Sequence, residues 1–596
     1  MTGRGASARL RAETAWAREC STNWWRQHVD GDRRILPCST RALFDEVAVL
    51  GDQVATMRDG VRLLADVYLP SRSAARGSLP TILIRMPYGK RAAYCYMPAH
   101  GRFWAQRGYA CVIQDVRGRH ASEGAWEPYD HEADDGWDTL DWVVGQPWCD
   151  GNVGMVGESY YGSTQWAVAP LGHPNLRALA PGDVDHDFYN AVHDGGALCL
   201  ATAAVWAWEM RRGGYRNHYR FDPWHLPLST ADTAAGRRAA RYQMLIEHPS
   251  RDSFWDRENE PLRYESITIP MLHWGGWYDV HVNGTLDGWR RVRECSASAT
   301  ARAQQWVMMG ATDHELSPEF TGMVGRTPVR DHGYAHDRLC GFMDRFVKGD
   351  DTAFAHDSPV LYHTVGDRGW RNASDWPPPT CEDSFFNLHS HGWAAVSATD
   401  GVLDRDEPGD EAVDTFVYDP ADPVEAWLGR SVWEAAKTMI DRSDVEARCD
   451  VLVYTSASLD DELDVTGPIR VHLFAASSAR DTDFTAALVD VFPDGFAQLV
   501  REGIVRARYR DSDREASLIE PGEVYEYTID LGSTSYCIAR GHRLRLELSS
   551  SNFDRYDRNL NTGGIWGHEA NYRPAQQRVF HDRGRPSRLV LSVASR

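Results

Sequence analysis

Residues 153–162 of this 596-residue chain read VGMVGESYYG, and this stretch decides the fold. Its apolar start predicts a buried strand, and the run STQWAVA at 163–169 predicts a helix that Pro170 ends. A serine on a glycine-flanked turn between strand and helix is a nucleophile elbow, which lifts the Ser159 hydroxyl above the sheet. The helix behind it directs backbone N–H groups toward any oxyanion formed there. Tyr161 replaces the second glycine of the strict G-x-S-x-G pattern, so a serine in an ordinary turn is the alternative.

Two downstream residues complete a candidate catalytic triad. The strand predicted at 269–274 leads into a loop that ends in Asp279, and the strand predicted at 306–310 leads into a loop with His314. Serine, acid and histidine in this chain order, each after a strand, match the triad order of the α/β-hydrolase fold. Taken alone, Asp279 would cap the helix that follows it and His314 would be an ordinary loop histidine. If His314 is the base, kcat/KM should fall at acid pH with an apparent pKa of roughly 6 to 7.

Short stretches spread along the chain carry a family resemblance. They are RMPY at 85–88, QDVRGR at 114–119 with SEG at 122–124, GESYYG at 157–162 with TQW at 164–166, GWYD at 276–279, FMDRFVKG at 342–349, SNF at 551–553 and NTGG at 561–564. Together they resemble the X-prolyl dipeptidyl-peptidase and cocaine-esterase group of α/β-hydrolases, the CocE/NonD family. The resemblance covers nearly everything after about Val49. The elbow of this family is G-x-S-Y-x-G, which accounts for Tyr161. The histidine matches least well, because the family has a Gly-Pro-Trp-like run where this chain has GATD at 310–313.

The resemblance implies a role for each member of the site. His314 would take the proton of the Ser159 hydroxyl, and Asp279 would fix the imidazole tautomer and stabilise the imidazolium. The backbone N–H of Tyr160 would be one donor to the oxyanion, and by resemblance the phenol of Tyr88 would be the second. Without the resemblance, Tyr88 would be a ring packed at a Pro-Tyr turn.

The order of the predicted elements divides the chain into parts. Residues 1–49 form an N-terminal arm. Residues 50–182 and 263–352 alternate strands and helices, as an α/β-hydrolase domain does. Residues 183–262 show helical segments without convincing strands, so we expect a helical cap inserted between the elbow and the acid. Residues 353–596 show alternating strands and turn signals, which predict a β-sandwich, and the resemblance makes it a jelly roll.

Composition limits the classes of partner. The net charge of −21 argues against nucleic acid and anionic membranes as main partners. No run approaches a transmembrane span, and residues 1–20 lack the apolar region of a secretory signal. The 11 cysteines include no C-x-x-C pair, so we expect reduced thiols and a cytoplasmic protein. His332 and His336 have i, i+4 spacing but no evident third ligand, so no metal and no cofactor is expected. The sequence leaves open whether the chain forms a homo-oligomer.

The residues that follow Asp279 indicate whether the substrate carries an amine. Family members that act on α-amino groups need a carboxylate clamp for the ammonium. In the amino-ester hydrolases such carboxylates stand two and three positions after the catalytic acid, where this chain has His281 and Val282. Four aspartates of the cap could supply another clamp: Asp183, Asp185, Asp187 and Asp194.

The aromatic residues near the elbow and in the cap favour an apolar acyl or alcohol group. Trp166, Trp206, Trp208 and His281 are the candidate substrate-pocket residues. The sequence therefore favours a serine hydrolase that cleaves carboxylic esters of uncharged acyl groups, aromatic ones among them. The alternatives are an X-prolyl dipeptidyl-peptidase, an amide or β-lactam acylase, or an acyltransferase on the same scaffold. A carbohydrate-binding scaffold without activity is the non-enzyme alternative, which the complete triad disfavours.

Overall fold

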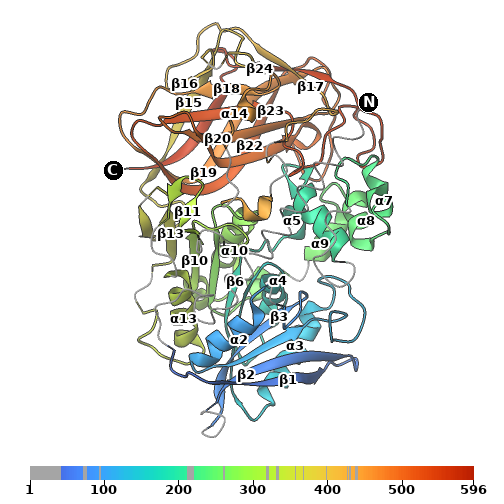
Figure 1. Cartoon of the computed structure of the whole chain (residues 1–596), viewed down its shortest axis with the longest axis vertical. Coiled ribbons are helices and arrows are strands. Elements are labelled where there is room, and N and C mark those ends of the chain that lie inside the picture. The colour runs from blue at the N-terminus through green and yellow to red at the C-terminus, as the bar shows by residue number, and fades with distance from the viewer. Residues whose placement is uncertain are drawn as a thin grey trace.

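The computed structural model describes residues 42–71, 77–92, 95–210, 221–259, 262–316, 321–329, 334–355, 358–366, 368–397, 399–425, 427, 431–436 and 441–595. Most of the expected N-terminal arm and His332 therefore lie outside the described residues. Figure 1 shows the elongated molecule, with the N-terminal sheet at one end and the C-terminal β-domain at the other.

A ten-stranded sheet forms the first domain, in the order β1-β2-β4-β3-β5-β6-β9-β10-β13-β14. Neighbouring strands are parallel from β4 to β13, and the pairs at both edges are antiparallel. Strands inside a parallel sheet are covered on both faces, which explains why β4 and β13 are buried along their whole length. The bounds are β1 Val47–Thr56, β2 Arg62–Pro70, β3 Leu79–Met86, β4 Ala110–Asp115, β5 Cys149–Glu158, β6 Leu176–Gly182, β9 Met271–Gly276, β10 Gln305–Gly310, β13 Val360–Thr364 and β14 Gly369–Ala373.

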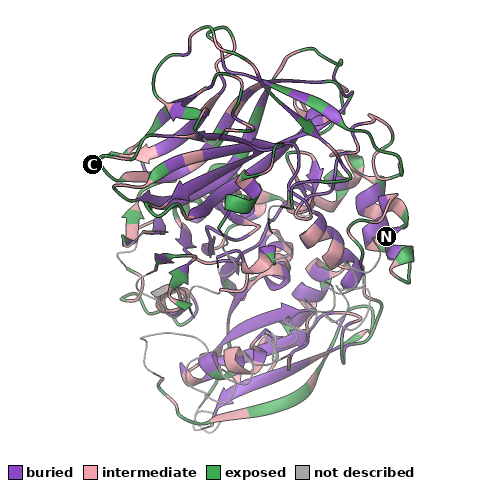
Figure 2. Ribbon diagram, turned by 45° about the horizontal axis from the view of Figure 1, so that its top comes forward, coloured by how far each residue is buried: buried purple, intermediate pink, exposed green. Residues whose placement is uncertain are grey.

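Helices cover both faces of this sheet. One apolar cluster contains side chains of α2 (Met97–Gln106) and α13 (Tyr334–Phe346). A second cluster contains side chains of α3 (Glu132–Val144), α4 (Ser159–Val168) and α10 (Val282–Cys295). Figure 2 shows the buried inner strands and the exposed residues along the edge strand β1. The short elements α11 (Ala299–Ala303), η1 (Ala169–Leu171), β11 (Met323–Val324) and β12 (Thr327–Pro328) complete the domain.

The sheet extends past the boundary that the sequence suggests at residue 352. β13 and β14 follow that point in the chain, yet β13 pairs in parallel with β10 and β14 pairs with β13. Because β13 is short, buried and flanked by turns, its pattern matches an inner strand of either domain, and only the pairing assigns it to the first sheet. At the other end, β1 begins at Val47, within the stretch assigned to the arm.

The cap follows β6 and consists mainly of short helices around its own apolar cluster. Its elements are α5 Phe188–Val192, β7 His193–Asp194, β8 Ala197–Leu198, η2 Leu200–Ala204, α6 Val205–Glu209, η4 Leu228–Thr230, α7 Ala231–Ala234, α8 Ala240–Glu247, α9 Ser253–Asn259 and η5 Tyr264–Ser266. The cap also contacts the C-terminal domain. Gly195 has a positive φ of 51°, and a Cβ there would lie 2.0 Å from the carbonyl oxygen of Ile504. Glycine thus lets the two backbones meet, and Arg506 donates its N–H to the Gly195 carbonyl at 2.8 Å.

The C-terminal domain is an eleven-stranded β-structure in the order β17-β24-β19-β25-β15-β16-β18-β23-β20-β21, with β22 also paired to β19. The predicted turn at 493–495 joins β20 to β21, where Gly495 has a φ of 93°. The bounds are β15 Cys381–His389, β16 Val402–Asp404, β17 Asp414–Tyr418, β18 Leu452–Thr455, β19 Leu463–Ser477, β20 Asp483–Val491, β21 Ala497–Arg506, β22 Tyr525–Ile538, β23 Arg543–Ser549, β24 Ala575–Phe580 and β25 Arg588–Ala594, with η6 Val432–Glu434, α14 Ser443–Glu446 and η7 Ala507–Tyr509 between them.

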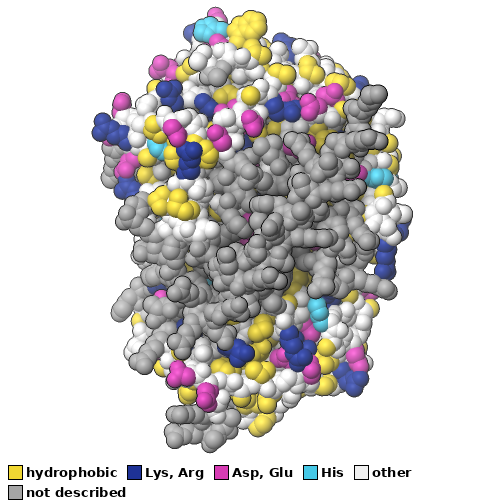
Figure 3. Space-filling model, in the orientation of Figure 1, with side chains coloured by type: hydrophobic (Ala, Val, Ile, Leu, Met, Phe, Trp, Pro, Cys, Tyr) yellow, Lys and Arg dark blue, Asp and Glu magenta, His cyan; other side chains and the backbone are white. Residues whose placement is uncertain are grey.

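The predicted fold, an α/β-hydrolase domain with an inserted cap and a C-terminal β-sandwich, is confirmed. In the part of the chain that the structure describes, no helix is both long and apolar enough to cross a bilayer. On the face shown in Figure 3, acidic and basic side chains are interspersed on both end domains.

Candidate active site

Ser159 stands at the junction of β5 and α4 with a positive φ of 54°. Such a backbone conformation is strained for serine and is typical of a functional turn. Gly157 before it has a φ of 140°, and a Cβ there would lie 2.0 Å from the ring of Tyr161. Gly162 would place a Cβ 2.9 Å from Val184 and 3.1 Å from the Gly182 carbonyl. The close approach that requires the second glycine therefore occurs one residue later than in the strict motif.

The candidate acid and the candidate base come from neighbouring parallel strands. Asp279 follows β9 and His314 follows β10, and the pairing of Gly276 with Gly310 aligns the ends of these strands. Nδ1 of His314 and Oδ2 of Asp279 lie 2.6 Å apart. The other carboxylate oxygen, Oδ1, accepts the backbone N–H of His281 at 2.5 Å. Both oxygens of the fully buried carboxylate are thus engaged, which fixes the orientation of the imidazole.

The charges of this pair shift both pKa values. Burial opposes ionisation of Asp279, but the adjacent His314 outweighs it and lowers the pKa of the carboxyl. Burial likewise opposes protonation of His314, but the charge and hydrogen bond of Asp279, with Glu315 and Glu158 nearby, raise its pKa to about 9. Burial lowers the pKa of the neighbouring His281 to about 4, so that ring stays neutral. Both shifts favour the charged forms, an imidazolium beside a carboxylate.

The serine lies at the same edge of the sheet. Glu158 pairs with Gly182 of β6, and Gly182 pairs with Trp274 of β9, so the elbow and the acid loop leave adjoining strands. The backbone N–H of Ser159 is bonded to the carbonyl of Asp183 at 3.2 Å. Ser159 and His314 both belong to the described residues, and no hydrogen bond joins the Ser159 Oγ to His314. Catalytic hydrogen bonds of this kind often form only when substrate is bound.

Two groups are candidate donors to an oxyanion at Ser159. The backbone N–H of Tyr160 lies in the first turn of α4, directly after the nucleophile. The phenol of Tyr88 follows β3, and its oxygen accepts the indole N–H of Trp206 at 3.3 Å. Burial raises the pKa of Tyr88 above its ordinary value, although hydrogen bonding to Trp206 and Ser159 favours the ionised form. Tyr88 is therefore a protonated donor within hydrogen-bonding reach of the serine.

An aromatic cluster adjoins this donor pair. Tyr129 stacks on Tyr160 at 4.6 Å between ring centres and contacts Phe188 at 4.5 Å. Trp206 lies 6.0 Å from Tyr129 and 6.2 Å from Tyr160. The Tyr160 hydroxyl donates to Glu132 at 2.9 Å and accepts the Tyr129 N–H at 2.9 Å, which fixes the cluster. Tyr129, with a positive φ of 74°, and Phe188 have no sequence motif that would have identified them.

The four predicted pocket residues divide into two groups. Trp206 contacts Tyr88, and the ring of His281 lies 5.6 Å from that of His314, so both adjoin the site. Trp208 instead lies fully buried in the cap, two residues from Trp206 and thus on another side of the helix. Trp166 lies in the apolar layer between α4 and α10, where a Cβ on Gly288 would approach its ring to 2.8 Å.

The cap aspartates bond to groups of the chain itself. Asp183 accepts the Gly276 N–H at 3.0 Å, and Asp185 accepts the Asp187 N–H at 3.2 Å. Asp187 caps α5 and pairs with Arg251. Asp194 accepts the hydroxyl of Tyr556 at 2.6 Å. These contacts stabilise the cap and its junctions, and they do not assemble the four carboxylates into one clamp.

Of two residues that adjoin the candidate triad, Glu158 stands within the elbow motif and Trp433 matches no motif of the sequence. Glu158 accepts the Tyr161 hydroxyl at 2.6 Å, which orders the turn beside the nucleophile. Trp433 comes from η6 of the C-terminal domain, and its ring lies 4.7 Å from that of His314. The backbone N–H of Ala436 in the same segment bonds to Asp313 at 3.0 Å. The β-sandwich therefore contributes directly to the surroundings of the base, which no local pattern in the sequence indicates.

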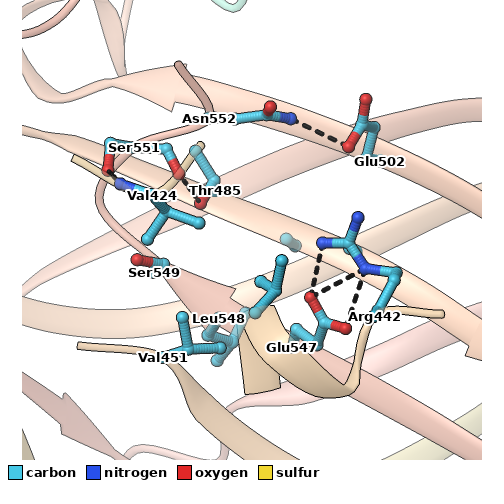
Figure 4. A pocket seen from close by; sticks show the side chains of 13 residues that line it. Val424, Arg442, Val451, Thr485, Glu502, Glu547, Leu548, Ser549, Ser551 and Asn552 are labelled. Carbon is cyan, nitrogen blue, oxygen red and sulfur yellow. Dashed lines mark hydrogen bonds and ion pairs between the residues drawn. The ribbon is translucent and has the colours of Figure 1, made fainter. Parts of the chain in front are cut away.

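A small polar cavity lies within the β-sandwich, away from these residues (Figure 4). Its volume of about 20 Å³ suits a single water molecule. Arg442 is bonded to Glu547 on one side, and Asn552 donates to Glu502 at 2.8 Å on the other. Ser551 and Asn552 of the SNF stretch thus line this cavity, whereas Phe553 belongs to the apolar cluster of the cap. The described residues hold no group of three or more His, Cys, Asp or Glu side chains arranged to bind a metal ion.

Comparisons with known proteins identify the family of the chain. Residues 59–315 match the X-Pro dipeptidyl-peptidase (S15 family) model, and residues 352–590 match the X-Pro dipeptidyl-peptidase C-terminal non-catalytic domain. The chain is 35% identical over 576 residues to a cocaine esterase of Rhodococcus sp. (strain MB1 Bresler), which covers 92% of this chain and 99% of that one.

Solved structures resemble the chain over nearly its full length. An aminopeptidase from the marine sediment archaeon Thaumarchaeota archaeon superposes with a TM-score of 0.79 at 26% identity, covering 95% of this chain and 100% of that one. An α-amino acid ester hydrolase superposes with a TM-score of 0.79 at 23% identity, covering 94% and 99%, and at this identity the likeness concerns the fold alone.

Proposed function

Because the chain belongs to the CocE/NonD group of the X-Pro dipeptidyl-peptidase (S15) family and is a serine hydrolase, we propose that it cleaves carboxylic esters of uncharged acyl groups, aromatic ones among them. The observation that supports this most is the 2.6 Å contact between His314 and Asp279 at the sheet edge that carries Ser159. A buried carboxylate that orients a histidine beside an elbow serine is the arrangement that acyl transfer needs.

The reaction uses these side chains in order. His314 takes the proton of the Ser159 hydroxyl as its oxygen attacks the ester carbonyl carbon, and Asp279 stabilises the imidazolium. The tetrahedral intermediate collapses when the bond to the alcohol oxygen breaks, and His314 gives its proton to the departing alcohol. Water then attacks the acyl-serine with His314 again as the base, which releases the carboxylic acid and restores the Ser159 hydroxyl.

The oxyanion is stabilised by two donors of different kinds. The Tyr160 N–H belongs to the rigid start of α4, and the Tyr88 phenol is held by the indole N–H of Trp206. Donors that already point at the developing charge need no reorganisation during the reaction, and one such donor is worth about 10²–10³-fold in kcat.

The aromatic cluster is suited to bind an apolar acyl group. Tyr129, Phe188 and Trp206 adjoin Tyr88, so an acyl chain whose carbonyl oxygen bonds to Tyr88 would lie against these rings. Aromatic pairs contribute about 0.5–1.5 kcal/mol beyond the burial of their area, which favours benzoyl-like acyl groups over short alkyl ones.

Labelling and turnover test this function. A fluorophosphonate should label the native enzyme and leave Ser159→Ala unlabelled. Turnover should be measured on phenyl and alkyl esters of benzoic and acetic acid, on aminoacyl esters and on Xaa-Pro anilides. Faster hydrolysis of benzoyl esters supports the proposal. Xaa-Pro anilides as the best substrates would contradict it and favour a peptidase.

A further inference from the structure

Arg119 is a buried cation that lacks a counterion among the described residues. Its side chain is only 3% exposed, and its Nη2 is buried and donates to no group of the described chain. Asp115, the acidic residue that acts on it, bonds instead to Lys90, through the backbone N–H at 2.7 Å and through Nζ at 3.1 Å. Burying an unpaired guanidinium costs free energy, and proteins retain such costs mainly at functional sites.

The guanidinium holds the loop that carries Tyr88. Nε of Arg119 donates to the carbonyl of Pro87 at 2.9 Å, and this carbonyl belongs to the peptide group that joins Pro87 to Tyr88. Nε2 of His120 lies 3.1 Å from the same oxygen. On the other side of the tyrosine, Gly89 has a φ of 109°, and a Cβ there would lie 3.0 Å from the His120 ring. Residues 119 and 120 therefore fix the backbone on both sides of Tyr88.

The same guanidinium holds the helix that contacts the Tyr88 phenol. Nη1 of Arg119 donates to the carbonyl of Met210, the residue that ends α6, at 3.0 Å. The backbone N–H of Met210 bonds to the carbonyl of Trp206 at 3.0 Å, and the indole N–H of Trp206 bonds to the phenol oxygen at 3.3 Å. One side chain thus joins the loop that carries the phenol to the helix that carries its hydrogen-bond donor.

The positive charge also adjoins the second candidate donor. The guanidinium carbon lies 4.9 Å from the centre of the Trp126 ring, and that ring lies 5.5 Å from the ring of Tyr160. An unneutralised cation in a buried site stabilises negative charge that develops nearby, such as the oxyanion at Ser159. It also makes a neighbouring phenol a stronger donor, because it favours negative charge on the phenol oxygen. Burial raises the pKa of Tyr88, and the charge of Arg119 opposes that rise.

We propose that Arg119 is the positioning residue of the oxyanion tyrosine: its bonds to Pro87 and Met210 place the Tyr88 phenol, and its unpaired charge strengthens that phenol as a donor. This role rests on the proposed ester hydrolysis and adds a residue that acts on the transition state without touching the substrate. The effect should therefore appear in kcat, and it should vanish when the phenol is absent. Loss of such support should lower kcat by about 10- to 100-fold.

Two substitutions of Arg119 test the role on an alkyl benzoate. Arg119→Met keeps the length of the side chain without the charge, so kcat should fall about 10- to 100-fold while KM stays within about threefold of native. Arg119→Lys keeps the charge and can donate to one of the two carbonyls, so its kcat should stay within about fivefold of native. The Tm of Arg119→Met should change by less than about 3 °C, because removal of an unpaired buried charge offsets the loss of two hydrogen bonds.

A double-mutant cycle separates action through Tyr88 from a general structural role. In the Tyr88→Phe background, the further change Arg119→Met should lower kcat by less than about threefold. Arg91→Met is the matched control, because it removes a half-exposed guanidinium from the same loop, where it pairs with Asp52 and Asp66, and its kcat should equal that of the native enzyme. The same loss from Arg119→Met in both backgrounds, or an Arg119→Lys enzyme as slow as Arg119→Met, would overturn the role.

Phenylboronic acid tests the role without turnover. Its boron bonds to the Ser159 oxygen while His314 takes the hydroxyl proton, which gives a tetrahedral anion that resembles the transition state. Calorimetry should show binding about 10- to 100-fold weaker in Arg119→Met than in the native enzyme. Methyl benzoate, which is neutral, should bind equally well to Ser159→Ala with and without Arg119→Met.

The two measurements distinguish a failure of this role from a failure of the proposed function. Ester hydrolysis by the native enzyme, with kcat and boronate binding unchanged in Arg119→Met, would refute the role and leave the function standing. Boronate binding that depends on Ser159 and Arg119 in an enzyme that hydrolyses no benzoate ester would refute the function and leave the role standing.

Discussion

The pH dependence of catalysis follows from the pair formed by His314 and Asp279. The pKa of His314 is raised to about 9, so at pH 7 only about 1% of the imidazole is neutral and able to act as a base. We therefore expect kcat/KM to rise about tenfold per pH unit from pH 6 to pH 8 and to level off near pH 9. Asp279→Asn removes the charge that raises this pKa and disturbs the tautomer, so kcat should fall about 10⁴-fold. The residual activity should lose its alkaline dependence, because burial alone lowers a histidine pKa here, as at His281.

The assay is the release of benzoate from a stable alkyl benzoate, followed by chromatography from pH 5 to pH 10, with a blank at each pH. An apparent pKa between 6 and 7 in the native enzyme would show that the Asp279 charge does not act on the base. An Asp279→Asn variant within about tenfold of native kcat would remove Asp279 from the triad.

The same pKa predicts a pH dependence of stability with a definite sign. The pKa of His314 is higher in the folded protein, about 9, than the roughly 6.5 of an unfolded chain. Its stabilising contribution is thus complete below pH 6.5 and is lost as the pH rises through 9, and it amounts to about 3 kcal/mol. The difference in Tm between native protein and Asp279→Asn should shrink from pH 6 to pH 10. A difference that grows over this range would contradict the assignment.

Four substitutions test the remaining parts of the site. Ser159→Ala should lower kcat by about 10⁴-fold or more with the Tm retained, and a variant with over a tenth of native turnover would exclude the serine as nucleophile. Tyr88→Phe should lower kcat by about 10²–10³-fold with little change in KM. Trp206→Phe removes only the N–H that bonds to the phenol, so its loss of kcat should be smaller. A Tyr88→Phe enzyme whose kcat stays within about threefold of native would show that the second oxyanion donor is another group. Gly162→Ala brings a methyl group to 2.9 Å from Val184, so it should destabilise the fold by about 1–3 kcal/mol and lower kcat, and an unchanged melting curve would disprove this explanation of the glycine.

The sequence predicts the fold well and points to a candidate triad, because both depend on order along the chain. The elbow, Asp279 and His314 each follow a strand, and strands of a parallel sheet bring their ends to one edge. The sequence predicts an apparent pKa of roughly 6 to 7 for His314, whereas the folded chain raises it to about 9. It depends on burial and on the charges of Glu158 and Glu315, which only the folded chain brings together.

The directions of individual side chains explain why other residues near the site could not be predicted from the sequence. Trp206 and Trp208 are equivalent in composition, but α6 turns one toward Tyr88 and the other into the cap interior. Tyr129 reaches the site from the loop before α3, and Trp433 reaches it from the β-sandwich, so both contacts are long-range. Such contacts leave no periodic pattern and no motif.

The contacts between the β-sandwich and the loops of Asp279 and His314 have a consequence for the synthesis of the chain. Trp433 contacts His314, and Arg501 donates to the carbonyl of Trp277 two residues before Asp279. The sandwich that carries these residues is completed by β25, which lies between β19 and β15 and follows both loops in the chain. A ribosome-bound chain can therefore contain all three triad residues and still lack the walls that position two of them. Hydrolysis would begin only once β25 has been synthesised and has paired, so shorter nascent chains would remain inactive.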